Sequence, residues 1–309
     1  MTEADPLAAR SKTLFWLFGY YLRWYFYRRF HGVRLSRSGV PAVSSGPLIV
    51  YSNHSSWYDP ALYIVLNTKL FPRRAGFGPM DEAALGKYGV LRRMGVFGVE
   101  QDSARGAAHF LRTSLRVLAD AAAMFWITGE GAFTDIRARP IVLRPGIAHL
   151  ARRVPDATIL PLAIEYTFWN ESKPEVLVRF GPPIETARDR SVAEWTAVLE
   201  AGLTRTMDAL ATEAMTRDPG LFQPVVRGAA GVGGIYDLYR RISAALAGQR
   251  FDPTHQGAEA TAVLKPSSAD GKGLGEGDAA QKQKPAFELP STLTPALSRQ
   301  REREKTRGA

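Results

Sequence analysis

The chain has 309 residues, of which 45% are hydrophobic, so it is long enough to bury one sizeable core. It contains no cysteine, which excludes disulfides and thiolate metal sites. Lys and Arg number 40 against 30 Asp and Glu, and residues 1–40 carry seven basic side chains against only Glu3 and Asp5. Such a basic segment suits anionic lipid headgroups or nucleic acid, although an ordinary solvated cationic surface has the same composition.

The first predicted element is a helix over residues 14–30, LFWLFGYYLRWYFYRRF, in which ten residues are aromatic. Arg23, Arg28 and Arg29 make it too charged, and it is too short, to span a bilayer, and no small-residue cleavage site follows it. Trp and Tyr flanked by Arg prefer the headgroup level. We therefore expect residues 1–32 to attach the protein peripherally, as a monotopic protein, to the cytoplasmic face of the cell membrane. The alternative is an aromatic helix packed on its own domain.

Residues 33–217 alternate predicted strands with predicted helices, which indicates an α/β layer fold. The strands are expected at 33–35, 48–51, 73–79, 95–99, 124–128, 141–143, 158–168 and 175–180, and the helices at 59–70, 104–122, 145–153 and 191–216. Residues 218–251 are predicted to be an accessory segment, rich in glycine and weakly helical at one patch. Residues 252–309 have few aromatic residues and are predicted to be a disordered tail.

The stretch SNHSSWYDP, residues 52–60, places His54 and Asp59 between a predicted buried strand and a predicted helix, where α/β proteins hold their sites. A neutral imidazole can take a proton from a hydroxyl, while a carboxylate on its other nitrogen fixes the tautomer. The alternative is that His54 closes a turn and Asp59 caps the helix. Asp59 could do both, because a carboxylate has two oxygens.

This stretch resembles the first motif of the glycerolipid acyltransferases, the family of glycerol-3-phosphate and lysophosphatidic acid acyltransferases. The motif is Asn-His, four residues and Asp after an apolar strand. Later blocks of the family are matched in order by GVFGVEQ (95–101), TGEGAFT (128–134) and ILPLAI (159–164), and RFGPPI (179–184) resembles a later strand. The second and third blocks are degenerate, and only Glu130 and Gly131 agree strictly in the third.

The resemblance implies a mixed central sheet flanked by helices, like that of glycerol-3-phosphate acyltransferase. It also implies transfer of a fatty acyl group from acyl-CoA or acyl carrier protein to a lipid alcohol, with His54 as the general base and Asp59 as its orienter. No cofactor or metal is implied beyond the acyl donor as co-substrate. The substrate contacts that it implies come from Asn53, Trp57, Gln101, Glu130, Gly131, Phe133 and Pro161.

The chain departs from the family at two positions. Relatives that acylate glycerol phosphates hold the phosphate with an arginine at the end of the second block and another in the third, where this chain has Gln101 and Phe133. Neither can replace a charged bidentate fork, so we predict an acceptor without a terminal phosphomonoester at this site. Lysophosphatidic acid stays open as an acceptor if Arg105, Arg137 or Arg139 supplies the displaced charge.

Other classes fit less well. A serine hydrolase would need a Gly-x-Ser-x-Gly elbow, which is absent, and Ser55-Ser56 follow the histidine on the wrong side. A non-catalytic lipid-binding protein of the same fold is an alternative, because the second and third blocks have drifted, although the intact His54 and Asp59 argue against it. Nucleic-acid binding is supported only by charge and by no motif, so no nucleic-acid partner is expected.

Overall fold

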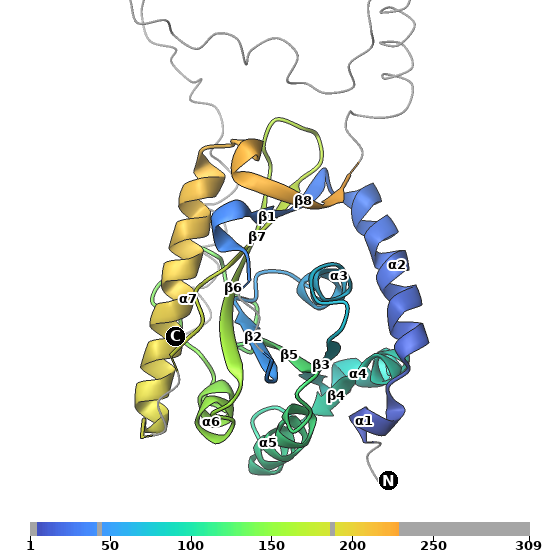
Figure 1. Cartoon of the computed structure of the whole chain (residues 1–309), viewed down its shortest axis with the longest axis vertical. Helices are drawn as coiled ribbons and strands as arrows, with labels where there is room; N and C mark the ends of the chain where they lie inside the picture. Colours follow the sequence, from blue (N-terminus) through green and yellow to red (C-terminus); the bar gives the residue numbers. More distant parts are fainter. Residues whose placement is uncertain (1–4, 42–44, 186–188, 229–309) are drawn as a thin grey trace, which may run out of the picture. The chain divides into compact units, whose positions relative to one another are not determined.

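The computed structural model describes residues 5–41, 45–185 and 189–228 (Figure 1). The expectations for residues 229–251 and for the tail at 252–309 lie outside these described residues.

The strands and helices of this part of the chain alternate along the sequence. The strands are β1 (Gly32–Ser36), β2 (Leu48–Ser52), β3 (Ala75–Asp81), β4 (Val96–Val99), β5 (Ala123–Thr128), β6 (Thr158–Thr167), β7 (Glu175–Phe180) and β8 (Phe222–Arg227). The helices are α1 (Pro6–Ala9), α2 (Lys12–Arg29), α3 (Asp59–Leu70), α4 (Glu82–Lys87), α5 (Ala104–Leu118), α6 (Gly146–Arg153) and α7 (Val192–Met215). Three short 3-10 helices are η1 (Arg37–Gly39), η2 (Gly89–Met94) and η3 (Pro219–Leu221).

The strands form one mixed sheet in the order β4-β3-β5-β2-β6-β7-β1-β8 (Figure 1). The strands from β4 to β6 pair in parallel, whereas β7 runs antiparallel to β6 and β8 runs antiparallel to β1. The prediction of an α/β fold with a mixed central sheet is therefore confirmed. Because β2 and its neighbours are parallel, their carboxyl ends meet at one edge, and the loops that follow them share that edge.

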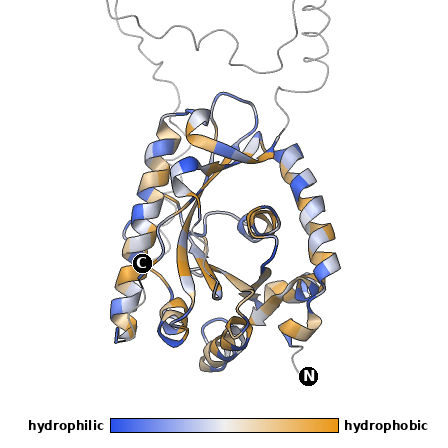
Figure 2. Cartoon of the chain, viewed as in Figure 1, coloured by the Kyte–Doolittle hydropathy of each residue, from blue (hydrophilic) through white to orange (hydrophobic). Residues whose placement is uncertain are grey.

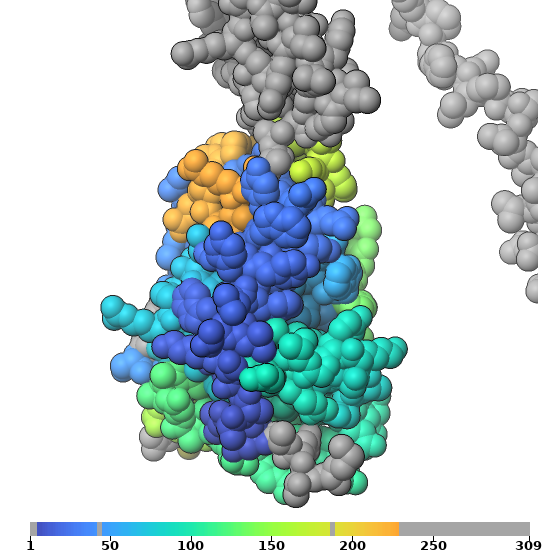
Figure 3. Space-filling model, turned by 90° about the vertical axis from the view of Figure 1, so that its right-hand side faces the viewer, coloured from blue at the N-terminus to red at the C-terminus, as the bar shows by residue number. Residues whose placement is uncertain are grey.

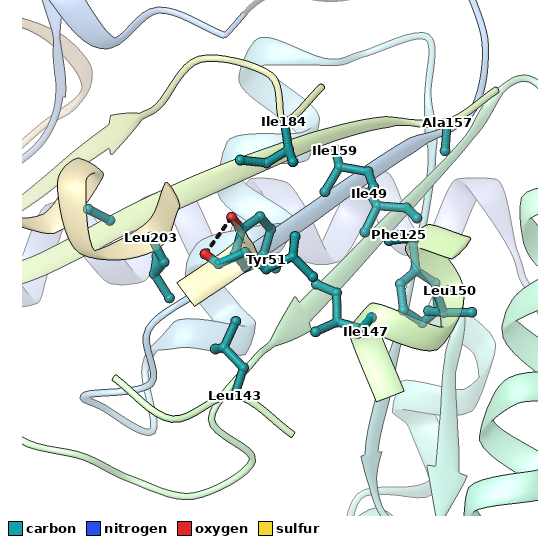
Figure 4. Close-up of a cluster of buried hydrophobic side chains, with 14 of the residues drawn as sticks. Ile49, Tyr51, Phe125, Leu143, Ile147, Leu150, Ala157, Ile159, Ile184 and Leu203 are labelled. Carbon is teal, nitrogen blue, oxygen red and sulfur yellow. Dashed lines mark hydrogen bonds between the residues drawn. The ribbon is translucent and has the colours of Figure 1, made fainter. Parts of the chain in front are cut away.

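Helices cover both faces of the sheet, which explains why the central strand β2, LIVYS, is buried along its whole length. Ile49 and Tyr51 belong to the core that α5, α6 and α7 cover, and Figure 4 shows these side chains beside Phe125 of β5. The Tyr51 hydroxyl donates a hydrogen bond of 3.0 Å to the Leu199 carbonyl oxygen of α7. Leu48 and Val50 alternate to the opposite face, which α2 and α3 cover.

Helix α2 belongs to this second core, so its aromatic composition serves packing in part. Phe15, Leu22 and Phe26 are buried, and a methyl group at Gly19 would collide with Thr68 of α3. A second set of side chains on the same helix is exposed: Leu17, Tyr20, Tyr21, Trp24 and Tyr27. Figure 2 shows the resulting mixture of apolar and polar residues along α2. None of the described helices is long and apolar enough to cross a bilayer.

Two segments differ from the sequence-based predictions. Residues 141–143 were predicted to be a strand, but they form a loop in which Ile141 and Leu143 are buried and Val142 is exposed. This alternation imitates a strand, yet the Leu143 amide donates to the Glu200 side chain and not to a neighbouring strand. Conversely, residues 222–227 lie in the predicted accessory segment but form β8, an edge strand in which Pro224 is tolerated.

Candidate active site

The loop after β2 brings His54 and Asp59 together. His54 Nδ1 lies 2.8 Å from Asp59 Oδ2, and the two side chains are 15% and 0% exposed. Asp59 is the first residue of α3 and not its cap, because Tyr58 holds the N-cap position without a side-chain hydrogen bond. Asp59 Oδ2 instead accepts a hydrogen bond of 3.1 Å from the Ser56 amide. The expectation that Asp59 caps the helix was therefore wrong, and its carboxylate faces the histidine loop.

A third donor to Asp59 is Tyr166, which the sequence analysis did not identify. The Tyr166 hydroxyl donates a hydrogen bond of 2.7 Å to Asp59 Oδ1, the oxygen that His54 does not use. Ser52, the last residue of β2, pairs with Leu162 of β6, so β6 continues past the end of β2 and carries Tyr166 to the site. Burial, and then the charge of Asp59, raises the pKa of Tyr166 well above its ordinary value, so the phenol remains a donor.

The loop after β5 holds the backbone of His54 on both sides. Glu130 Oε2 accepts a hydrogen bond of 2.7 Å from the His54 amide, and the Thr134 amide donates one of 2.8 Å to the His54 carbonyl. Gly131 has φ +69°, a left-handed conformation that favours glycine, and this lets the loop turn back. The Phe133 ring then lies 4.3 Å from the His54 ring, centroid to centroid, while remaining 64% exposed.

The other predicted contact residues are divided between the interior and the surface. Asn53 is buried, and its side chain makes hydrogen bonds of 2.9 and 3.0 Å to the backbone of Ile164, so it fixes the start of the loop and does not face a substrate. Pro161 is buried inside β6 beside Tyr51 and is likewise part of the fold. Trp57, between His54 and Asp59, is exposed, and so is Gln101 after β4.

The three arginines that could have replaced the phosphate-binding side chains are engaged elsewhere or face solvent. Arg137 pairs with Asp135 at 2.8 Å, and both side chains are exposed. Arg139 pairs with Asp208 of α7 at 2.6 Å. Arg105 is exposed in the first turn of α5.

A different arginine, Arg144, joins the loops after β4 and β5. Its amide donates a hydrogen bond of 2.9 Å to the Gly129 carbonyl, and its guanidinium lies against Gly131, where an added Cβ would be 2.6 Å from Nε. The same guanidinium pairs at 2.7 Å with Asp102, the residue after Gln101. Arg144 was not among the predicted site residues, because it lies outside the blocks that resemble the family.

The arrangement defines a single nitrogen for proton transfer. A neutral His54 that donates Nδ1–H to Asp59 carries its lone pair on Nε2, where a hydroxyl can deliver its proton. An ionised carboxylate at Nδ1 can also stabilise an imidazolium, and the hydrogen bonds from Tyr166 and the Ser56 amide hold the Asp59 carboxylate in place. Within residues 5–41, 45–185 and 189–228, no group of three or more His, Asp or Glu side chains is arranged to hold a metal ion.

Comparison with known proteins assigns a family to the part of the chain that holds the dyad. Residues 28–165, which include His54, Asp59 and Glu130, match the family model named Acyltransferase. Residues 28–165 are therefore an acyltransferase domain, as the motifs predicted. The solved structures that match include the 1-acyl-sn-glycerophosphate (LPA) acyltransferase PlsC from Thermotoga maritima, at 15% identity and a TM-score of 0.46, covering 65% of this chain and 79% of that one. No curated protein matches.

Proposed function

We propose that the protein transfers a fatty acyl group from a thioester, acyl-CoA or acyl carrier protein, to the hydroxyl of a lipid, and that His54 is the general base. One observation carries this proposal: the 2.8 Å contact between His54 Nδ1 and the fully buried Asp59 carboxylate. An alcohol is a weak nucleophile at neutral pH, so a base with a fixed tautomer is what this acceptor requires.

The reaction balances with these two side chains. His54 Nε2 takes the proton of the acceptor hydroxyl as its oxygen attacks the thioester carbonyl. The tetrahedral intermediate then expels the thiolate, which recovers the proton from the imidazolium, so that a thioester and an alcohol become an ester and a thiol. In this mechanism Asp59 takes no proton from the ring but orients it and stabilises its charge.

The exposed face of α2 supports the expected peripheral attachment to a membrane surface. Tyr21 and Trp24 project from it, and Arg28 and Arg29 close the helix with their guanidinium groups 5.2 and 5.5 Å from the rings of Trp24 and Tyr25. Amphipathic rings beside arginine are typical of the headgroup level of a bilayer. The same helix reaches the end of the loop that carries His54, since the rings of Tyr25 and Tyr58 lie 6.3 Å apart, centroid to centroid.

Two kinds of acceptor are candidates. The exposed Gln101 and the Phe133 ring against His54 favour a lipid alcohol without a phosphomonoester, such as a glycolipid, an amino lipid or a terpenoid glycoside. Arg144 favours the second candidate, lysophosphatidic acid. Its pair with Asp102 is largely exposed, and such pairs contribute only about 0–1 kcal/mol, so an acceptor phosphate can exchange with Asp102.

A screen of donors and acceptors with the purified protein in detergent, read by mass spectrometry, tests the proposal. If His54→Ala and Asp59→Asn transfer acyl groups as fast as the wild type, the dyad is not catalytic. If the wild type transfers to none of the lipids, the result favours the non-catalytic alternative. A kcat/KM of about 10⁴ M⁻¹s⁻¹ or more on lysophosphatidic acid would contradict the first acceptor candidate.

Arg144→Gln separates the two acceptor candidates further. Loss of one charge-assisted contact, about 1.5–3 kcal/mol, should raise the KM for lysophosphatidic acid at least about tenfold if Arg144 binds the phosphate. The KM for a neutral monoacylglycerol should not change. Arg152→Gln, on an exposed residue of α6, is the matched control. Equal KM values for lysophosphatidic acid in the two variants would mean that Arg144 does not bind the phosphate, and would favour the acceptor without a phosphomonoester.

A further inference from the structure

A groove lies between α2 and β8, away from the His54 dyad. Its volume is about 510 Å³, and it is lined by one side of α2, by Lys69 near the end of α3 and by residues 224–227 of β8. Figure 3 shows the blue surface of α2 running up to the orange surface of η3 and β8. The proposed catalytic chemistry uses none of the side chains that line this groove.

The charge of the groove has one sign. Arg23, Lys69 and Arg227 reach it from three different elements, and no carboxylate is among its lining residues. Arg23 Nε is buried and has no hydrogen-bond partner among the described residues, and no ion pair of Lys69 or Arg227 is found there. Because Nε itself is enclosed, an anion in the groove would be bound by the terminal nitrogens of Arg23, whose side chain is only partly buried and whose guanidinium lies 5.0 Å from the centroid of the Tyr20 ring.

The rim of the groove is aromatic. Tyr20, Trp24 and Tyr27 line it and are 69%, 50% and 46% exposed. A soluble anion would use the cations alone and would leave these rings in water. The phosphate of a phospholipid uses both, because rings of this kind lie at the level of the lipid ester groups while cations bind the phosphate.

We propose that this groove binds the headgroup of one anionic phospholipid, with the phosphate held by Arg23, Lys69 and Arg227. The site rests on the proposed attachment of α2 to a membrane and goes beyond it, because it fixes which side of α2 meets the lipid. A chain of aromatic side chains also connects this lipid site to the proposed catalytic centre. Trp24 adjoins Tyr25 in the helix, Tyr25 contacts Tyr58, and the Tyr58 ring lies 6.1 Å from that of Tyr166 at the dyad.

Vesicle flotation of the full chain tests the proposal, with phosphatidylcholine vesicles that contain or lack phosphatidylglycerol. The groove variant carries Arg23→Gln, Lys69→Gln and Arg227→Gln. The control variant loses the same charge at exposed residues elsewhere, through Arg73→Gln, Lys87→Gln and Arg152→Gln. We expect the groove variant to lose affinity for the anionic vesicles by about tenfold or more relative to the control. Equal losses would overturn the proposal, because they would show attraction by net charge alone.

Two further arms complete the test. Inorganic phosphate should not release the protein from the vesicles more than chloride does at equal ionic strength, and a stronger release by phosphate would identify a free anion as the occupant. Because Arg23 lies on a packed helix, its loss could unfold the protein, which circular dichroism would reveal. In that case a double groove variant, Lys69→Gln with Arg227→Gln, is compared with a double control, Arg73→Gln with Arg152→Gln. A larger loss of affinity in the groove variant supports the proposal, and equal losses overturn it.

Discussion

Tyr166→Phe removes one of the three hydrogen bonds that hold the Asp59 carboxylate, and leaves those from His54 and the Ser56 amide. The lost bond is 2.7 Å long and ends on a fully buried carboxylate, and hydrogen bonds to charged groups contribute about 1.5–3 kcal/mol. Since the bond orients the base and does not touch the substrate, we expect kcat to fall about tenfold or more and the KM for both substrates to stay within about twofold. Steady-state acyl transfer, read by mass spectrometry, measures both constants.

Tyr63→Phe is the matched control for this experiment. Tyr63 is also buried, and its hydroxyl makes a hydrogen bond of 2.5 Å to Ser52, which is not part of the dyad. Both variants should lose a similar free energy of unfolding, about 1–3 kcal/mol, but only Tyr166→Phe should lose turnover. An equal kcat in the two variants would refute a positioning role for Tyr166 and leave it a purely structural residue.

Two other predictions concern buried carboxylates. Asp59→Asn should lower kcat by about 10³–10⁴-fold, because an amide cannot fix the tautomer of His54 or stabilise its charge. Asp135→Asn, on an exposed carboxylate of the neighbouring loop, is its control, and similar activities would contradict the orienting role. At Glu175, burial raises the pKa, but hydrogen bonds from His31 and Arg34 outweigh it and leave the pKa lowered. A lowered folded pKa stabilises the protein above the unfolded pKa and loses that stability as pH falls through the folded value. The free energy of unfolding should therefore decline below about pH 4.3 more steeply in the wild type than in Glu175→Gln, as urea titrations at several pH values would show, and equal slopes would exclude this contribution.

The order of elements from β2 to β7 was largely predictable, because local patterns determine it. The apolar run at 48–51 predicted β2. The predicted helix from residue 104 is α5, and the Ser103 side chain before it accepts a hydrogen bond of 2.9 Å from the Gly106 amide. The alternation of apolar residues gave a wrong prediction where side chains are buried by the core and not by strand pairing. Residues 141–143 alternate in burial because Ile141 and Leu143 reach the core, and no strand pairs with them.

The site residues that could be predicted are those that lie close together in the sequence. His54 and Asp59 are five residues apart, so one loop brings them together. Tyr166 could not be recognised from spacing, because its place depends on the register of β6 against β2 and on the extra length of β6. Arg144 depends likewise on the path of the loop that pairs it with Asp102, a contact across 42 residues.

Acyl transfer by His54→Ala tests the proposed mechanism most directly. His54 lies on a loop with a partly exposed side chain, so its removal should leave the fold intact, while turnover should fall by about 10²–10⁴-fold. His149→Ala, on a half-buried histidine of α6 that contacts Arg153 and not the dyad, is the control and should keep wild-type turnover. Loss of transfer in His54→Ala alone is the result that the proposed mechanism predicts. Near-normal turnover in a folded His54→Ala protein would contradict it.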